Sequence, residues 1–209
     1  LMSGGIHRIW KRRFVAEVRP RPGERILDLA GGTGDIAFRL AQAAPGASVL
    51  VCDLTEGMVE VGRARAHDRG LDDAVGFVVA DAEALPLPSG AFDACTVAFG
   101  LRNVTRIDTA LAEARRVLRP GGRFLCLEFS RVTVAALAPV YDAYSFKVLP
   151  FLGRTVAKDE EAYRYLAESI RRFPAQPDLA NRMKAAKLER VTWRDLSGGI
   201  AAIHSGWKI

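Results

Sequence analysis

The residues with the clearest chemical potential form one glycine-rich stretch, residues 28–35, which reads Asp-Leu-Ala-Gly-Gly-Thr-Gly-Asp. The stretch follows an apolar run and precedes a helical pattern. Glycines let backbone N–H groups approach a ligand closely, and the N-terminus of a helix adds partial positive charge. The same letters also satisfy the G-x-G-x-x-A pattern of dinucleotide sites, so the loop alone leaves its ligand open. The expected ligand contacts in the loop are Gly31, Gly32, Thr33 and Gly34.

Three carboxylates discriminate between the possible ligands. Asp53, which ends the second apolar run and is followed by Leu54, lies where an acid can accept ribose hydroxyls. Asp28 precedes the glycines, where a carboxylate favours a cationic group and repels a pyrophosphate. Asp81 and Ala82 follow the third run, where an acid can accept an adenine amino group. S-Adenosylmethionine carries a sulfonium and an ammonium but no phosphate, so the three acids favour it over a nicotinamide cofactor.

Two patterns that would indicate other chemistry are missing from the sequence. None of the four tyrosines has a lysine four residues later, as a short-chain dehydrogenase would need. Cys52, Cys95 and Cys126 form no CxxC pair and no metal-ligand spacing. We therefore expect these cysteines to behave as small hydrophobes and expect no metal site.

An open α/β sheet would bring these motifs together. Short runs that are apolar throughout suit parallel strands buried on both faces, and helical patterns separate them. The clearest helix covers residues 105–118, with Thr105 and Asp108 at capping spacing and a turn at residues 119–122 after it. Residues 190–196 and 200–209 read as an antiparallel pair, so one strand near the end is reversed. The expected parallel strands are residues 26–30, 47–52, 75–80, 94–99 and 123–128.

The N-terminal 25 residues are basic and amphipathic. They hold seven of the thirty Lys and Arg residues in a chain of net charge +6, which fits either nucleic acid or an anionic membrane surface as a partner. A second stretch, residues 134–174, is a helical insertion rich in aromatic residues. We treat residues 1–209 as a single domain. The apolar face of the first stretch is expected to contain Ile6, Ile9, Trp10, Phe14 and Val18.

The sequence resembles the ubiquinone/menaquinone biosynthesis C-methyltransferase family over essentially its whole length. The resemblance implies a Rossmann-like class I S-adenosylmethionine-dependent methyltransferase fold, mostly parallel with an antiparallel terminal strand. It also implies cofactor contacts at Thr33, Asp53, Asp81 and Ala82, and at Ala98, where the family often has Ser. The segments that carry the resemblance are residues 5–11, 27–35, 99–104, 119–122, 127–130, 141–146 and 163–170.

The activity implied by the resemblance is methyl transfer to a ring carbon of a polyprenylated benzoquinol or demethylmenaquinol. We expect Arg102 to stabilise the developing phenolate and Asn103 to orient the ring, since both leave the fourth strand at its carboxyl end. Arginine stays protonated and is a poor base, so water or His204 would accept the proton. The expected substrate pocket contains Tyr141, Tyr144 and Tyr165.

A lipid substrate changes the expected partner of the basic N-terminal stretch. Its Trp and Ile face could rest at a bilayer while its Arg and Lys residues meet anionic headgroups, as a peripheral enzyme would. We expect no nucleic-acid partner, and a location at the inner membrane facing the bacterial cytoplasm, or on the mitochondrial matrix side in a eukaryote. The alternative function is methylation of RNA or of another small molecule. A homodimer or a biosynthetic complex remains open.

Overall fold

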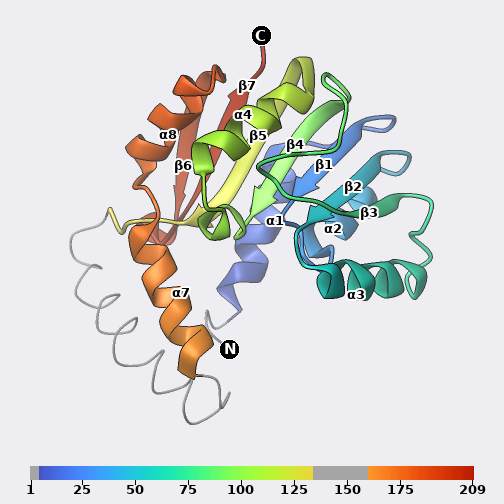
Figure 1. Cartoon of the computed structure of the whole chain (residues 1–209), viewed down its shortest axis with the longest axis horizontal. Coiled ribbons are helices and arrows are strands. Elements are labelled where there is room, and N and C mark those ends of the chain that lie inside the picture. The colour runs from blue at the N-terminus through green and yellow to red at the C-terminus, as the bar shows by residue number, and fades with distance from the viewer. Residues whose placement is uncertain (1–4, 134–159) are drawn as a thin grey trace.

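A computed structural model of the protein describes residues 5–133 and 160–209. Seven strands form one sheet in the order β3-β2-β1-β4-β5-β7-β6 (Figure 1). Among the strands that the structure describes, only β7 is antiparallel to its neighbours, β5 and β6, which confirms a mostly parallel sheet with one reversed strand near the end. The strands are β1 Arg25–Leu29, β2 Ser48–Asp53, β3 Val75–Val79, β4 Phe92–Ala98, β5 Leu118–Phe129, β6 Glu189–Leu196 and β7 Ala201–Trp207.

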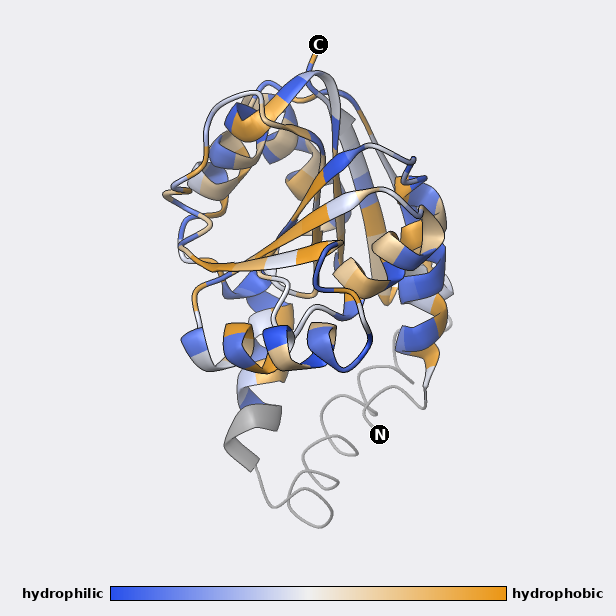
Figure 2. Ribbon diagram, turned by 90° about the vertical axis from the view of Figure 1, so that its right-hand side faces the viewer, coloured by the Kyte–Doolittle hydropathy of each residue, from blue (hydrophilic) through white to orange (hydrophobic). Residues whose placement is uncertain are grey.

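Helices cover both faces of this sheet. Figures 1 and 2 show α1 and α2 on one face and α4 and α8 on the other, while α7 extends past the end of the sheet at which the parallel strands finish. The N-terminal end of α1 lies at that same end. The helices are α1 Ile6–Val18, α2 Asp35–Ala43, α3 Glu56–His67, α4 Ile107–Val117, α7 Glu160–Arg172 and α8 Gln176–Ala185, with 3-10 turns η1 Leu101–Asn103 and η4 Ser197–Gly199.

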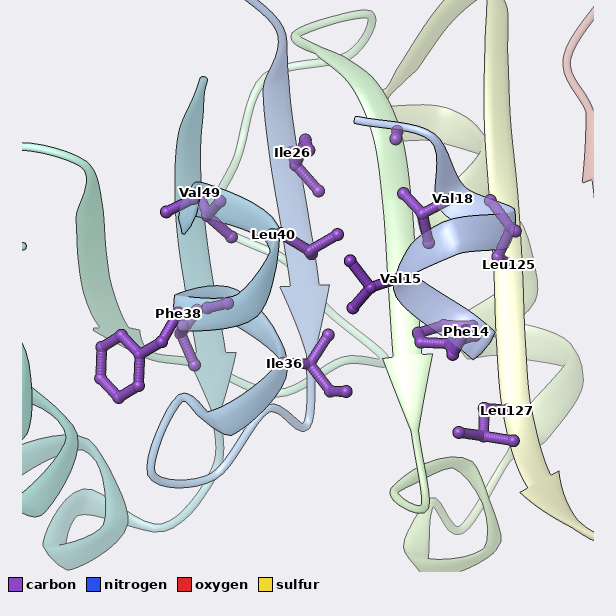
Figure 3. Close-up of a cluster of buried hydrophobic side chains, with 14 of the residues drawn as sticks. Phe14, Val15, Val18, Ile26, Ile36, Phe38, Leu40, Val49, Leu125 and Leu127 are labelled. Carbon is purple, nitrogen blue, oxygen red and sulfur yellow. The ribbon is translucent and has the colours of Figure 1, made fainter. Parts of the chain in front are cut away.

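Two hydrophobic clusters, one on each face, explain why the central strands are apolar throughout. In β1, Ile26 belongs to the cluster under α1 and α2, while its neighbour Leu27 belongs to the cluster under α4 and α8. Figure 3 shows Phe14 of α1 and Leu40 of α2 in the first cluster. The expectation of burial on both faces is wrong for β3, the edge strand, because only β2 pairs with it and the side chain of Val79 is 41% exposed.

The boundaries of α4 differ from the prediction at both ends. The helix begins at Ile107 with Arg106 as N-cap and no side-chain cap, so the expected capping by Thr105 is wrong. Instead Glu83, distant in sequence, accepts the Arg106 N–H at 2.8 Å. After α4 the expected stop is confirmed, since the helix ends at Val117. Residues 119–122 fall within the bounds of β5 but interrupt its pairing with β4 between Leu118 and Arg123, and Gly121 has a φ of 78°. A tertiary contact therefore replaces the local signal at the start of α4, whereas the local signal at its end holds.

The amphipathic helix α1 uses its apolar side for the core. Phe14 and Val18 are fully buried and Trp10 is 3% exposed, whereas Ile9 is 53% exposed. The expectation that a face containing Trp10 and Ile9 rests on a bilayer is therefore wrong, since the tryptophan packs on the sheet. Within the described residues, no helix is long and apolar enough to cross a membrane.

Candidate active site

The glycine-rich loop connects the carboxyl end of β1 to α2 and is tightly packed at Gly31. The Gly31 N–H donates to the Cys52 carbonyl of β2 at 3.2 Å. A Cβ atom at Gly31 would lie 2.7 Å from Oδ2 of Asp28 and 2.8 Å from Cγ1 of Val51. Ala30 adopts a left-handed conformation with φ 48°, which a non-glycine residue rarely does. Strain of this kind clusters at ligand-binding sites, so the loop geometry is consistent with the predicted role.

Asp28 lies directly beneath this loop and is fully buried. Its Oδ1 accepts a hydrogen bond from the Thr96 hydroxyl at 2.7 Å, whereas its Oδ2 has no partner among the described residues. Burial raises the pKa of Asp28 to about 7, against the opposing effect of the Thr96 hydrogen bond. A buried carboxylate oxygen without a donor fits a ligand that brings a cationic donor, such as the ammonium group of S-adenosylmethionine.

Asp53, at the end of β2, joins the glycine loop to α3. Its Oδ2 accepts the Gly32 N–H at 2.8 Å and its Oδ1 accepts the Thr55 N–H at 2.9 Å. A carboxylate offers about four acceptor positions, so lone pairs remain for ribose hydroxyls. The neighbouring Leu54 side chain is 70% exposed, which leaves an apolar surface beside the carboxylate.

The other predicted cofactor contacts lie around the same edge of the sheet. The Thr33 carbonyl accepts a hydrogen bond from Nη1 of Arg65 at 3.1 Å, and the Thr33 hydroxyl accepts from the same nitrogen. Asp81, just after β3, is exposed, and its Oδ1 accepts the Glu83 N–H at 2.8 Å. Ala82 and Ala98, which follow β3 and end β4, are half-buried.

Arg102 lies in η1, immediately after β4, and forms a buried ion pair that the sequence did not reveal. Its Nη1 lies 3.1 Å from Oε1 of Glu128, and the two side chains are 13% and 1% exposed. Burial raises the pKa of Glu128, and the Arg102 charge opposes that rise. The signal available in the sequence was a single acid, Glu128, in the otherwise apolar residues 124–129. The guanidinium expected to stabilise the phenolate is thus also one partner of an ion pair.

An aromatic cluster supports η1 from below. The rings of Phe99 and Phe129 lie 4.8 Å apart, and the indole of Trp10 lies 6.2 Å from the first and 6.1 Å from the second. The guanidinium carbon of Arg102 sits 5.5 Å from the centre of the Phe129 ring. Trp10 also donates through Nε1 to the Ser197 hydroxyl at 3.0 Å. Helix α1 is therefore part of the support of the candidate active site.

Of the three tyrosines predicted to bind the substrate, the structure describes Tyr165. The Tyr165 hydroxyl of α7 donates to Oδ1 of Asn103 at 3.3 Å, so these two predicted site residues do meet. The Tyr165 side chain is 58% exposed. Tyr141 and Tyr144 lie outside the described residues, together with much of the predicted insertion.

His204 does not belong to this site. It is 2% exposed, its Nε2 is hydrogen-bonded to the Gln176 carbonyl at 3.0 Å, and its ring stacks on Trp193. The burial lowers the pKa of His204. The expectation that His204 accepts a substrate proton is wrong, because the residue fastens β7 to α8 within the core.

The cysteines behave as predicted. Cys52, Cys95 and Cys126 are buried as free thiols, which confirms them as small hydrophobes. Burial raises the pKa of Cys52 to about 12. In the part of the chain that the structure describes, no group of three His, Cys, Asp or Glu residues could hold a metal ion.

Unsatisfied buried polar atoms mark the edge of the sheet at which these residues gather. Among the described side chains, four buried polar atoms have no hydrogen-bond partner. One of them, Nδ1 of His204, lies on β7 away from the site, and the other three are Oδ2 of Asp28, Nε of Arg102 and Oγ of Ser130. They follow or end the adjacent strands β1, β4 and β5. Buried polar groups are normally paired, so three unpaired groups at neighbouring strand ends fit a polar ligand bound there.

Comparisons with known proteins identify the family of the chain. The sequence model of the ubiE/COQ5 methyltransferase family matches residues 1–208. The ubiquinone/menaquinone biosynthesis C-methyltransferase UbiE of Acidiphilium cryptum is 59% identical over 209 residues, which cover 100% of this chain and 84% of the relative. The enzyme of the same name from Paracoccus denitrificans is 56% identical with the same coverage.

Solved structures agree at the level of the fold. An S-adenosylmethionine-dependent methyltransferase from Aquifex aeolicus superposes with a TM-score of 0.68 at 16% identity, covering 95% of this chain and 89% of that one. This likeness confirms the class I methyltransferase fold expected from the sequence. Together with the match over nearly all residues, it shows that the chain belongs to the ubiE/COQ5 methyltransferase family.

Proposed function

We propose that this protein transfers a methyl group from S-adenosylmethionine to a ring carbon of a polyprenylated benzoquinol or demethylmenaquinol. The observation that carries the proposal is the direct contact between the acidic glycine loop and the η1 turn. A Cβ atom at Gly100 would lie 2.6 Å from Cβ of Ala30, so the loop after β4 abuts the loop after β1. The relatives' shared name supplies the substrate class.

Three acids would hold the methyl donor. Asp28 would pair with its ammonium group, Asp53 would accept hydrogen bonds from its ribose hydroxyls and Asp81 would accept one from its adenine amino group. When bound, S-adenosylmethionine supplies the methyl group, and its sulfur keeps the electron pair of the broken carbon–sulfur bond. The fit rests on Oδ2 of Asp28, which lacks a donor among the described residues, and on the remaining acceptor positions of Asp53.

The chemistry at the acceptor requires an ionised phenol. A ring carbon becomes nucleophilic when the adjacent hydroxyl has lost its proton, and water accepts that proton here. Arg102 stabilises the phenolate as a hydrogen-bond donor, since its guanidinium stays protonated. Asn103 orients the ring, together with the Tyr165 hydroxyl that it contacts. The ring proton leaves to solvent after the new carbon–carbon bond forms, which restores aromaticity.

The outer face of α1 supports a peripheral location at an anionic membrane. Arg8, Arg12 and Arg13 are exposed on it, beside the 53% exposed side chain of Ile9. The N-terminal end of α1 lies at the same end of the sheet as α7 and the candidate active site (Figure 1). A membrane contacted there, facing the bacterial cytoplasm, would deliver a prenylated substrate to the site.

A methyl-transfer assay tests the function. The protein is incubated with labelled S-adenosylmethionine and, in separate reactions, with reduced demethylated benzoquinol, with reduced demethylated naphthoquinol, or with tRNA. Each quinol carries a prenyl chain, and the labelled carbon is located in the product by NMR. Label on a ring carbon of either quinol is the expected result. Label on tRNA, with neither quinol methylated, would overturn the proposal in favour of the RNA alternative.

A further inference from the structure

The guanidinium of Arg102 is held from one side only. Its Nη1 donates to Oε1 and Oε2 of Glu128 at 3.1 and 3.3 Å, and to the Phe99 carbonyl. Its Nε is buried and has no partner, and its Nη2 makes no hydrogen bond to any residue that the structure describes. Nη1 thus makes all the described hydrogen bonds of the guanidinium, and the edge formed by Nε and Nη2 makes none to the described residues.

Several contacts fix the guanidinium in this orientation. Glu128 also accepts the backbone N–H of Arg102 at 3.3 Å and that of Phe129 at 2.9 Å, which immobilises the carboxylate itself. The Phe129 ring lies against the guanidinium, at 5.5 Å from Cζ. The Glu128 side chain is only 1% exposed, so its carboxylate is shielded from solvent.

We propose that Glu128 is a positioning residue that holds Nη1 of Arg102, so that Nε and Nη2 together form a two-donor site for the ionised phenol oxygen. This inference rests on the proposed function. Adjacent N–H groups of an arginine fork bind an anionic oxygen with defined geometry. Because Glu128 balances the charge of Arg102, the site acts through directed hydrogen bonds and not through net charge.

This arrangement makes a prediction opposite to that of a simple charge effect. If Arg102 acted only as a positive charge, removal of the Glu128 charge would unmask it and raise the rate. If Glu128 positions the fork, the same change lets the guanidinium rotate and lowers the rate. The Glu128→Gln variant therefore separates the two explanations by the direction of the change in kcat.

The test compares Glu128→Gln with a matched control, Glu24→Gln. Glu24 is also a buried carboxylate, 9% exposed, and it binds Arg123 through two contacts of 2.9 and 2.7 Å. It precedes β1, at the opposite end of that strand from the glycine loop. The measurements on the full-length protein are kcat and KM for the quinol, the Kd for S-adenosylmethionine by calorimetry, and the Tm.

The expected result for Glu128→Gln is a fall in kcat of about 10- to 100-fold, below the loss that follows complete removal of an oxyanion donor. KM for the quinol and Kd for the methyl donor should stay within about 3-fold, since the fork acts on charge that develops during the reaction. Glu24→Gln should lower the Tm comparably and leave kcat unchanged. A kcat for Glu128→Gln equal to or above that of the unaltered protein would overturn the inference.

A second variant decides the matter if Glu128→Gln does not fold. Arg102→Lys keeps the positive charge but loses the Nε–Nη2 fork, so it should lose as much kcat as Arg102→Ala. Turnover near the normal value in Arg102→Lys would overturn the inference while leaving the proposed function intact. If the unaltered protein methylates neither quinol, the substrate itself is wrong and both proposals fall.

Discussion

The Tyr165 hydroxyl lies 3.3 Å from Oδ1 of Asn103, which ties α7 to the η1 turn at the mouth of the candidate active site. The two residues are 62 positions apart in sequence and come from different elements. The contact links a residue of the expected substrate pocket with the residue predicted to orient the substrate ring. It is exposed, so its energetic value is modest.

We predict that Tyr165→Phe raises KM for the quinol by about 2- to 10-fold, the range expected from one hydrogen bond of ordinary net strength. The change removes only the hydroxyl and leaves the ring in place, so kcat and the Tm should stay unchanged. Steady-state kinetics check the prediction. In a double-mutant cycle, Tyr165→Phe should have no further effect on KM when Asn103 is already Ala; full additivity would contradict the coupling.

The raised pKa of Asp28 predicts that binding of the methyl donor depends on pH. Below about 7 the free protein holds a proton on this carboxyl, and a cationic ammonium favours its ionised form. Affinity for S-adenosylmethionine should therefore rise with pH and level off above about 7, with proton release on binding at pH 6. Calorimetry in buffers of different ionisation enthalpy measures that release, and Asp28→Asn should abolish it.

The same shift predicts how the stability of the ligand-free protein varies with pH. The folded-state pKa of about 7 lies above the ordinary value of 3.8, so the native state binds more protons than the unfolded state between them. The contribution of Asp28 is fully present below about 3.8 and is lost as pH rises through about 7. Denaturant titrations should show a flatter profile for Asp28→Asn across this window; an unchanged slope would refute the assignment.

The tight packing around Gly31 predicts that Gly31→Ala is costly. Its Cβ atom would meet Asp28 and Val51 at under 3 Å, so we expect a loss of about 1–3 kcal/mol in the free energy of unfolding, as in other overpacked sites, and weaker binding of the methyl donor. Gly57→Ala is the matched control. Gly57 lies in α3 with open space around its Cβ position, so the same change there should stabilise by about 0.5–1 kcal/mol. Equal effects at both sites would contradict the packing argument.

The exposed arginines of α1 predict salt-sensitive membrane binding. Replacement of Arg8, Arg12 and Arg13 by Gln should weaken the binding free energy for anionic vesicles by about 1 kcal/mol per residue. The affinity measured by flotation should therefore fall roughly 100-fold in all. The control replaces Arg19, Arg21 and Arg190, which are also exposed, and changes the net charge equally. Equal losses in both triple variants would indicate a general charge effect and not a membrane face on α1.

Features written in local sequence were predictable. The glycine loop, its flanking strand and the reversed strand near the end all follow from turn chemistry and apolar runs, and Asp53 lies at its expected strand end. Features that depend on which helices and strands pack together could not be predicted from the sequence. The pairing of Glu128 with Arg102 and the inward direction of Trp10 arise only when β5, η1 and α1 pack together.

The two sides of α1 have separate tasks within one short segment. Its inner side supplies Trp10, Phe14 and Val18 to the core beneath the active site, while its outer side carries exposed arginines. The segment therefore cannot be removed as a detachable anchor without damage to the fold. Natural variation should accordingly be unequal around its circumference, with outward positions free to change and inward ones held nearly constant.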